Sequence, residues 1–291
     1  MAVLVDLSQL CISGVFAYSA FGDALSDENP DKERVLSILR HVVLSQIKAY
    51  KKKFCAEYGE MIISCDGRHY WRKKIFPNYK SERKKIRESN HLDWRNIFDS
   101  INDIVQELKD VFPYRTILVN EAESDDVIAI LTKKFVNEGE RVLIISSDRD
   151  FVQLQKYKGV LQFSPQTKKF IIAEEPTLYL QEKVLRGDKG DSIPNILSVD
   201  DTFVKGLKQR TLTKKRIEKI ILSNNNFDDD EELKKRYIRN RNLIDFDYIP
   251  KDIEDKILEE YKQPIKGSKG KIFNYLIEKK CGSFLKEIES F

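Results

Sequence analysis

The chain has 291 residues, of which 41% are hydrophobic and 34% charged, with a formal net charge of +4. No run of about 18 apolar residues is present, which excludes a transmembrane helix, and the first residues lack the features of a signal peptide. The four cysteines, Cys11, Cys55, Cys65 and Cys281, fit neither a zinc-binding nor a disulfide spacing, so we expect free thiols and a cytoplasmic location.

The first part of the chain alternates predicted strands and helices. Apolar runs predict strands at 2–7, 60–65, 114–119 and 141–147, and helical spacing predicts helices at 33–56, 92–111 and 124–138. This order is typical of an α/β fold with a mainly parallel central sheet and helices on both faces. Residues 160–163 and 168–173 are predicted as a hairpin at the sheet edge.

The predicted secondary structure changes near residue 187. No further convincing strand follows, and helical segments are predicted near 201–208, 213–223, 231–244, 251–262, 270–280 and 283–290. Residues 224–230 are acidic and rich in asparagine, so we expect an exposed loop there. We therefore predict an α/β domain over residues 1–187 and an all-helical domain over residues 188–291.

Acidic residues follow the predicted strands one after another. In an open parallel sheet, ligands bind at the carboxyl ends of the strands, where these side chains would gather. A single aspartate after a strand is more often a turn or cap residue, and Asp126 fits a capping role as well as a ligand role. The full set is a candidate site for two Mg²⁺ ions, with Mn²⁺ as a substitute, because hard cations prefer oxygen ligands. Its members are Asp6, Asp66, Glu123, Asp125, Asp126, Asp148, Asp150, Asp188 and Asp191.

A strongly basic segment begins one residue after Asp66 and covers residues 68–90. Nine of the residues between 67 and 87 are Lys or Arg, and Tyr70, Trp71, Phe76 and Tyr79 stand among them. Such a run is often only a solvated surface, but beside an acidic site it can steer a polyanion and stack its bases. We therefore expect nucleic-acid contacts from Arg68, Arg72, Lys73, Lys74, Tyr79, Lys84, Lys85 and Arg87, and from a second basic helix with Lys214, Lys215 and Arg216.

Three acidic blocks, in this order, resemble those of the 5′-nuclease (flap endonuclease) superfamily. They are Glu123-Ser-Asp-Asp-Val-Ile-Ala, Ser147-Asp-Arg-Asp-Phe-Val-Gln-Leu and Gly187-Asp-Lys-Gly-Asp-Ser-Ile-Pro-Asn. Tyr79-Lys-Ser-Glu-Arg is similar to the basic motif of the superfamily's helical arch. Tyr70-Trp-Arg, Leu243-Ile-Asp-Phe-Asp-Tyr-Ile-Pro and Gly270-Lys-Ile-Phe-Asn-Tyr resemble its branch of ribonucleases H from T-even-type bacteriophages, so the resemblance covers nearly the whole chain.

The resemblance implies a 5′-to-3′ exonuclease and flap endonuclease acting on RNA·DNA and DNA·DNA duplexes, which removes RNA primers from lagging-strand fragments in an infected bacterial cell. It implies that Lys80 and Arg83 hold the scissile phosphate and that residues 188–223 bind duplex. It places Asp6, Asp66, Glu123, Asp125 and Asp148 around a first metal, and Asp150, Asp188 and Asp191 around a second that Asp148 also reaches. A monomer that docks a single-stranded-DNA-binding protein on residues 231–291 is implied as well.

Several points of the sequence depart from the superfamily pattern or leave alternatives open. Ser192 and Asn195 stand where the pattern has Asn and Gly, so we do not expect the monovalent-ion site of that turn. Glu121 offers a second register for the first acidic block. A sliding clamp is a possible partner, but only five residues precede Asp6, which leaves little room for a docking peptide. The rival functions are a PIN-like ribonuclease and a catalytically silent protein that binds forked DNA.

Overall fold

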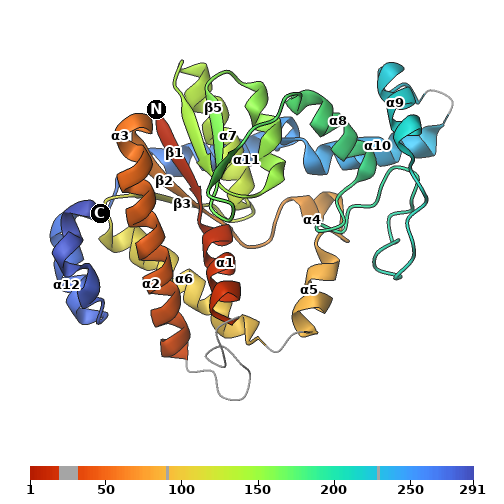
Figure 1. Ribbon diagram of the computed structural model, residues 1–291. Coiled ribbons are helices and arrows are strands. Elements are labelled where there is room, and N and C mark those ends of the chain that lie inside the picture. Colours follow the sequence, from red (N-terminus) through yellow and green to blue (C-terminus); the bar gives the residue numbers. More distant parts are fainter. Residues whose placement is uncertain (20–31, 90–91, 228–229) are drawn as a thin grey trace.

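A six-stranded sheet with the order β3-β2-β1-β4-β5-β6 forms the centre of the protein (Figure 1). The computed structural model describes residues 1–19, 32–89, 92–227 and 230–291. Neighbouring strands are parallel from β3 to β5, and only β6 is antiparallel to its neighbour. The strands are β1 (Ala2–Asp6), β2 (Glu60–Cys65), β3 (Arg115–Leu118), β4 (Val142–Ile145), β5 (Val160–Ser164) and β6 (Lys169–Ile171). The predicted mainly parallel sheet and its edge hairpin are confirmed.

Helices cover both faces of this sheet, which is why every residue of the central strands β1 and β4 is buried. Val3 and Val5 of β1 face a core shared with α1 (Leu7–Ser19), α2 (Lys32–Tyr50), α6 (Trp94–Val111) and α12 (Lys269–Glu278). Ala2 and Leu4 face the opposite core, which α7 (Ser124–Asn137) and α11 (Lys251–Lys262) close. All four cysteines are free, as expected, and Cys11, Cys65 and Cys281 are buried.

The predicted helices of the first part are present, with changes at their ends. The helix expected at 33–56 is α2 followed by a π-helical turn, η2 (Lys51–Cys55), and α3 (Ala56–Tyr58). The one expected at 92–111 begins at Trp94, because the Asp93 side chain accepts a hydrogen bond from the Asn96 backbone and caps it. The 3-10 helix η3 (Arg149–Lys156) is the next element after β4.

Two of the longer helices, α1 and α8 (Pro176–Arg186), were not predicted from the sequence. The buried positions of α1 have helical spacing, but Phe16 and Ala17 are apolar on its exposed side and obscure the pattern. For α8 the signals were a proline at the first position and a glycine, Gly187, after the last.

The second part of the chain is helical, with α9 (Lys214–Leu222), α10 (Glu231–Ile244), the 3-10 helix η4 (Phe246–Tyr248), α11, α12 and the 3-10 helix η5 (Gly282–Ser290). The predicted helix at 201–208 is wrong: residues 201–206 form turns, and 207–208 are irregular. Phe203 is buried, but Val204 and Leu207 are exposed, so the segment lacks the apolar face that a helix would bury. The loop predicted at 224–230 is seen for residues 224–227, where Phe227 is buried rather than exposed, and residues 228–229 lie outside the described residues.

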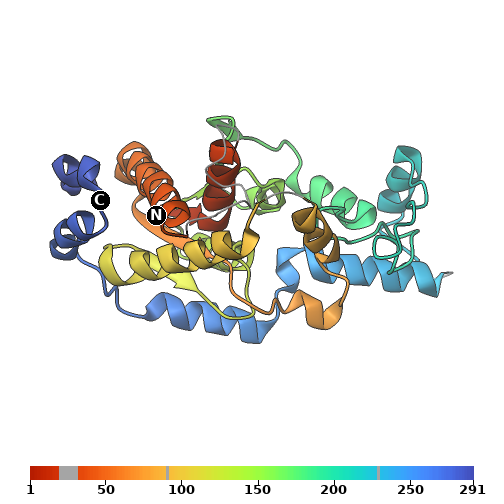
Figure 2. The ribbon, with the colours of Figure 1, turned by 90° about the horizontal axis from the view of Figure 1, so that it is seen from below.

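The chain's last helices return to the sheet. Ile253 and Ile257 of α11 belong to the core with α7, and Ile272 and Leu276 of α12 belong to the core with α2 and α6. Figures 1 and 2 show α9 and α12 at opposite ends of an elongated molecule. No helix in the described part of the chain is long and apolar enough to cross a membrane. The division of the chain at residue 187 stays a prediction.

Candidate active site

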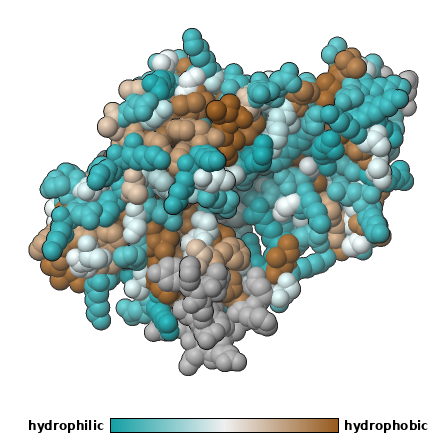
Figure 3. All heavy atoms as spheres, in the orientation of Figure 1, coloured by the Kyte–Doolittle hydropathy of each residue, from teal (hydrophilic) through white to brown (hydrophobic). Residues whose placement is uncertain are grey.

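The carboxyl ends of the parallel strands open into a cleft of about 370 Å³. Its lining includes Asp6, Asp66, Glu123, Asp125, Asp148, Lys80 and Arg83. Residues of α1 and of the basic segment both line the cleft. Figure 1 shows these two parts of the chain below the sheet, and the face of the molecule seen in Figure 3 is mainly hydrophilic. The structure thus brings residues from four separate sequence blocks to one place.

Asp6 lies at the centre of the sheet edge and is only 8% exposed. Its carboxylate accepts hydrogen bonds from the hydroxyls of Ser124 and Ser146, each at 3.1 Å, and from the Gln9 backbone at 3.2 Å. Burial, with the nearby Asp66 and Asp148 carboxylates, raises the pKa of Asp6 to about 7, although the hydrogen bonds from Gln9 and Ser146 act to lower it. Asp6 is therefore fixed in position, but its surroundings offset little of the negative charge that its ionised carboxylate carries.

The start of α7 carries three carboxylates whose oxygen atoms lie within 4.8 Å of one another: those of Glu123, Asp125 and Asp126. Glu123 and Asp126 form a reciprocal capping box, in which each side chain accepts from the other's backbone N–H. Asp125 points differently, and its Oδ1 is buried without a hydrogen bond from any described residue. Burial raises the pKa of Asp125 well above its ordinary value, so a cation beside it would be strongly favoured.

A close backbone contact joins the end of β2 to this cluster. Gly67 donates its N–H to the Ala122 carbonyl at 2.8 Å, and a Cβ at Gly67 would lie 2.1 Å from the Val119 carbonyl oxygen. Only glycine permits this approach. As a result Asp66, which is exposed, accepts a 2.8 Å hydrogen bond from the Ser124 backbone and lies beside α7.

Arg72 is a buried counter-ion of the cluster. Its guanidinium lies 2.8 Å from Glu123 and 2.8 Å from Asp126, and its Nε donates to the Leu243 carbonyl at the end of α10. The Trp71 indole donates to Asp126 at 2.9 Å. Arg72 is only 2% exposed, so the structure contradicts its expected contact with nucleic acid. Asp126, with its oxygens taken by Arg72, Trp71 and the Glu123 backbone, is placed as a capping group behind Asp125.

The described part of the basic segment, residues 68–89, is folded and contains the short helices α4 (Arg72–Ile75) and α5 (Ser81–Glu88). Its aromatic residues Trp71, Phe76 and Tyr79 are buried, which corrects the expectation that they stack on bases. Phe76 and Tyr79 pack instead with Leu180 and Val184 of α8. One side of this segment therefore packs against the rest of the protein. The aromatic rings lie on that side, and most of the charged groups face outward.

Lys80 and Arg83 lie inside the cleft among acidic groups. The Lys80 ammonium contacts Glu123 and lies 3.9 Å from Asp191, while Arg83 lies 2.6 Å from Asp191. The Tyr79 hydroxyl oxygen lies 2.9 Å from a carboxylate oxygen of Glu123 and 2.9 Å from one of Asp191, and its single proton is available to either. Burial alone would raise the pKa values of Glu123 and Asp191, but Lys80 with Arg72 and Arg83 lowers both. These two carboxylates are therefore ionised and each has a cation in contact.

A second acidic group lies toward α8 and contains Asp148, Asp150 and Asp188. Gly187, with φ +68°, turns the chain so that Asp188 and Ile193 pair through two backbone hydrogen bonds of 2.8 and 2.7 Å. Lys183 of α8 reaches this group, with its ammonium in contact with Asp150 and 2.9 Å from Asp188. Burial raises the pKa of Asp148, and Lys183 opposes that rise.

The remaining predicted cations are placed outside the cleft. Arg68, Lys73, Lys74, Lys84, Lys85, Lys214, Lys215 and Arg216 are exposed. Arg87 is half-buried, with its guanidinium 4.7 Å from the centre of the Phe98 ring. Glu121, the alternative member of the first acidic block, contacts Lys74 and lies 2.8 Å from Lys256 of α11. It is therefore directed away from the acidic cluster that contains Glu123.

The donor set fits a hard divalent cation. Every candidate ligand is a carboxylate oxygen, and the buried Asp125 Oδ1 accepts no hydrogen bond from the described residues, with the Arg72 guanidinium 3.8 Å away. The raised pKa values of Asp6, Asp125 and Asp148 show that negative charge is incompletely neutralised there. The sequence pattern identified the carboxylates but missed the Ser124 and Ser146 hydroxyls and Lys183, because nothing local in the sequence distinguishes them from ordinary surface residues.

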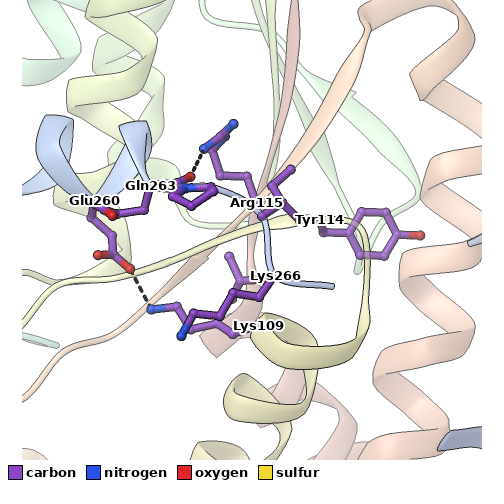
Figure 4. Close-up of a pocket in the computed structure, with 9 residues that line it drawn as sticks. Lys109, Tyr114, Arg115, Glu260, Gln263 and Lys266 are labelled. Atoms are coloured by element: carbon purple, nitrogen blue, oxygen red, sulfur yellow. Dashed lines mark hydrogen bonds and ion pairs between the residues drawn. The ribbon is translucent and has the colours of Figure 1, made fainter. Parts of the chain in front are cut away.

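Another cavity, of about 340 Å³, lies at the free edge of β3 (Figure 4). Two of its three cations have partners: Lys109 lies 2.6 Å from Glu260, and Arg115 donates to the Gln263 carbonyl at 2.8 Å. Figure 4 shows both side chains directed toward the end of α11. These contacts fasten α11 to β3 and α6, so the cavity is part of how the last helices attach.

Comparison with known proteins gives consistent matches. Residues 2–184 match the family described as 5′-3′ exonuclease, N-terminal resolvase-like domain, and residues 175–291 match that described as T4 RNase H, C terminal. The chain is 33% identical over 306 aligned positions to ribonuclease H of Enterobacteria phage T4, covering 99% of this chain and 95% of that protein. It is 29% identical to the flap endonuclease Xni of Shewanella denitrificans over 63% of this chain and 72% of that protein.

Solved structures of one phage protein have the same fold. A complex of the bacteriophage T5 flap endonuclease with DNA and metal ions matches with a TM-score of 0.64 and 19% identity, covering 90% of this chain and 99% of that one. The T5 5′-exonuclease with bound zinc matches with a TM-score of 0.61 and 17% identity, covering 90% of this chain and 98% of that one. At these identities the likeness establishes the fold.

Proposed function

Because the chain belongs to the 5′-3′ exonuclease (5′-nuclease) family and is therefore a nuclease, we propose that it hydrolyses RNA·DNA and DNA·DNA duplexes from their 5′ ends and cuts 5′ flaps. We further propose that it removes RNA primers during phage DNA replication. The observation that carries the proposal is the carboxylate cleft at the sheet edge, with Lys80 and Arg83 inside it. The phage T4 relative bears the name ribonuclease H, and the T5 structure holds DNA and metal ions.

In this proposal Asp6, Asp66, Glu123, Asp125 and Asp148 hold a first Mg²⁺. Asp150, Asp188 and Asp191, with Asp148 shared, hold a second. When bound, such ions would activate the attacking water and offset the charge of the leaving oxygen. The chain's own groups keep the ligands in place: Ser124 and Ser146 orient Asp6, and Arg72 fixes Glu123 from behind.

Lys80 and Arg83 serve the scissile phosphate. Both cations contact carboxylates of the cleft, so a phosphodiester between them and the carboxylates would have its non-bridging oxygens within their reach. Preorganised cations of this kind stabilise the extra negative charge of the transition state. The exposed cations at 68–87 and 214–216 would hold the flanking phosphates without reading the base sequence.

The test uses a labelled 5′-flap duplex and an RNA-primed duplex with Mg²⁺. We expect cleavage by the wild-type protein, loss of cleavage for Asp125→Asn and normal cleavage for Glu121→Gln, a matched carboxylate outside the cleft. No cleavage of either substrate by the wild type would refute the proposal. Preference for single-stranded RNA without a 5′ junction would instead indicate a PIN-like ribonuclease, and binding without cleavage a silent DNA-binding protein.

We also propose that residues 231–291 dock a single-stranded-DNA-binding protein. Phe273 and Ile277 are exposed at 51% and 53%, one helical turn apart on α12. Deleting the last helices would remove parts of both cores, so point variants are the better test. Phe273→Asp with Ile277→Asp should abolish binding to that protein and leave flap cleavage unchanged; undiminished binding would place the docking surface elsewhere.

A further inference from the structure

Lys183 has a mostly buried side chain, and its ammonium group lies in the second acidic group. Its side chain is 15% exposed, and its ammonium contacts Asp150 and lies 2.9 Å from Asp188. It belongs to α8, where the neighbouring Val184 is buried and the Val184 carbonyl accepts a 2.9 Å hydrogen bond from the Asn240 side chain. The proposed mechanism assigns Lys183 no role, yet it neutralises two of the carboxylates assigned to the second ion.

The two acidic groups of the cleft are compensated in different ways. In the first group the contacting ammonium is that of Lys80, which the substrate phosphate could draw away from Glu123. In the second it is Lys183, which extends from a helix packed against α10 through Leu180, Val184 and Leu243. An ammonium and a divalent ion cannot both bind the same carboxylate oxygens at close range, and a positive charge left nearby repels the ion.

We infer that Lys183 is a built-in counter-ion of the Asp150–Asp188 pair and sets a low affinity of this pair for the second divalent ion. The inference rests on the proposed function, because it takes this pair as the ligands of that ion. Lys183 acts through the two carboxylates and is a positioning residue. Its charge keeps the pair together when no ion is bound, and it must withdraw along its flexible stem before both carboxylates can bind one.

The test measures Mn²⁺ binding to the full-length protein by electron paramagnetic resonance, without nucleic acid. We expect the wild type to bind one Mn²⁺ firmly and a second weakly. Lys183→Met should tighten the second site by roughly ten- to thirtyfold, since it removes the positive charge that competes with the ion for Asp150 and Asp188. Lys183→Arg, which keeps the charge, should leave the second site weak.

Two further variants test whether a change in Mn²⁺ affinity occurs at the second site and is specific to Lys183. Asp188→Asn should remove the second site in both the wild-type and the Lys183→Met background. Lys189→Met is the matched control: Lys189 is adjacent to Asp188, is exposed and forms no ion pair among the described residues, so its loss should change the second site less than threefold. If Lys183→Met does not fold, as judged by circular dichroism, Lys183→Gln provides the same comparison.

The inference would be overturned if Lys183→Met left the Mn²⁺ affinity of the second site unchanged. It would also be overturned if Lys189→Met changed that affinity as much as Lys183→Met does. Weaker binding of a 5′-flap duplex by Lys183→Met with unaltered Mn²⁺ affinities would also overturn it, and would make Lys183 a phosphate contact. The proposed function is tested separately by flap cleavage with Mg²⁺. A wild type that binds two Mn²⁺ but never cleaves would refute the function without touching the role of Lys183.

Discussion

Asp6→Asn should stabilise the metal-free protein at alkaline pH while abolishing its activity. Asp6 is buried at the centre of the sheet edge, and burial together with Asp66 and Asp148 raises the pKa of its carboxyl from an ordinary value of 3.8 to about 7. Without a cation, the ionised carboxylate therefore destabilises the folded state relative to the unfolded chain. An amide has nearly the same shape and carries no charge.

The direction and size of the effect follow from the two pKa values. Because the folded-state pKa is the higher, the folded protein binds the Asp6 proton more tightly, and stability is lost as the pH rises from about 4 to about 7. The full loss at pH 8 is about 4 kcal/mol, from about 1.4 kcal/mol per pKa unit. The amide of Asp6→Asn offers one acceptor oxygen where the carboxylate offers two. The hydrogen bond lost in the variant reduces its gain in stability by about 1 kcal/mol. We therefore expect a net gain of about 3 kcal/mol at pH 8 and little gain at pH 5.

The assay is thermal unfolding in EDTA, followed by circular dichroism at pH 5 and pH 8. For a chain of this size, 3 kcal/mol corresponds to a rise in Tm of roughly 6–12 °C at pH 8. Asp99→Asn, on the exposed surface of α6, is the matched control and should leave Tm within about 2 °C at both pH values. With excess Mg²⁺ the order should reverse at pH 8, because only the wild type gains the full binding energy of the ion.

Two results would refute this reasoning. If Asp6→Asn raises Tm equally at pH 5 and pH 8, the gain does not come from ionisation of Asp6. If it lowers Tm at pH 8 in EDTA, the hydrogen bonds from Ser124, Ser146 and Gln9 outweigh the cost of the buried charge, and the pKa of Asp6 is not raised.

Four other outcomes are expected. Lys80→Met and Arg83→Met should each lower kcat for flap cleavage about a hundredfold in single-turnover assays with Mg²⁺, and an unchanged rate would remove that residue from the mechanism. Arg72→Met should lower the free energy of unfolding by about 3–5 kcal/mol in urea titrations, because it leaves buried carboxylates without a counter-ion, whereas the exposed Lys73→Met should change it by under about 0.5 kcal/mol. Lys214→Met should weaken duplex binding equally for different sequences and reduce the salt dependence by about one phosphate contact; a sequence-dependent loss would contradict this. EDTA should abolish cleavage, and Mg²⁺ or Mn²⁺ should restore it; cleavage that persists in EDTA would exclude a metal requirement.

Features that depend on neighbouring residues could be read from the sequence. The apolar runs of β1, β2 and β4 and the acidic residues that follow them were identified because a strand's side chains and its end are set locally. Their meeting at one sheet edge followed from parallel pairing. Where the local pattern was ambiguous the prediction failed: α1 carries apolar residues on its exposed side, and at 201–208 only Phe203 of the apolar residues is buried, while Val204 and Leu207 are exposed.

The basic segment shows what the sequence could not decide. Charge density predicted a surface for nucleic acid, but it did not separate Arg72, buried against Glu123 and Asp126, from Lys73, which is exposed. The two are adjacent in the chain and similar in charge. Their difference arises because α4 turns one side toward α7 and α10, a contact between residues about 50 and 170 positions apart.

The sequence by itself determined the α/β architecture and the order of carboxylates along the sheet edge, since both follow from periodicity and from strand ends. Only the tertiary structure decided which cation neutralises which carboxylate: Arg72 behind Glu123, Lys80 in front of it and Lys183 at Asp188. The physical reason is the short range over which one charge neutralises another. Electrostatic compensation acts across a few ångströms of space, and the chain brings those partners together only by folding.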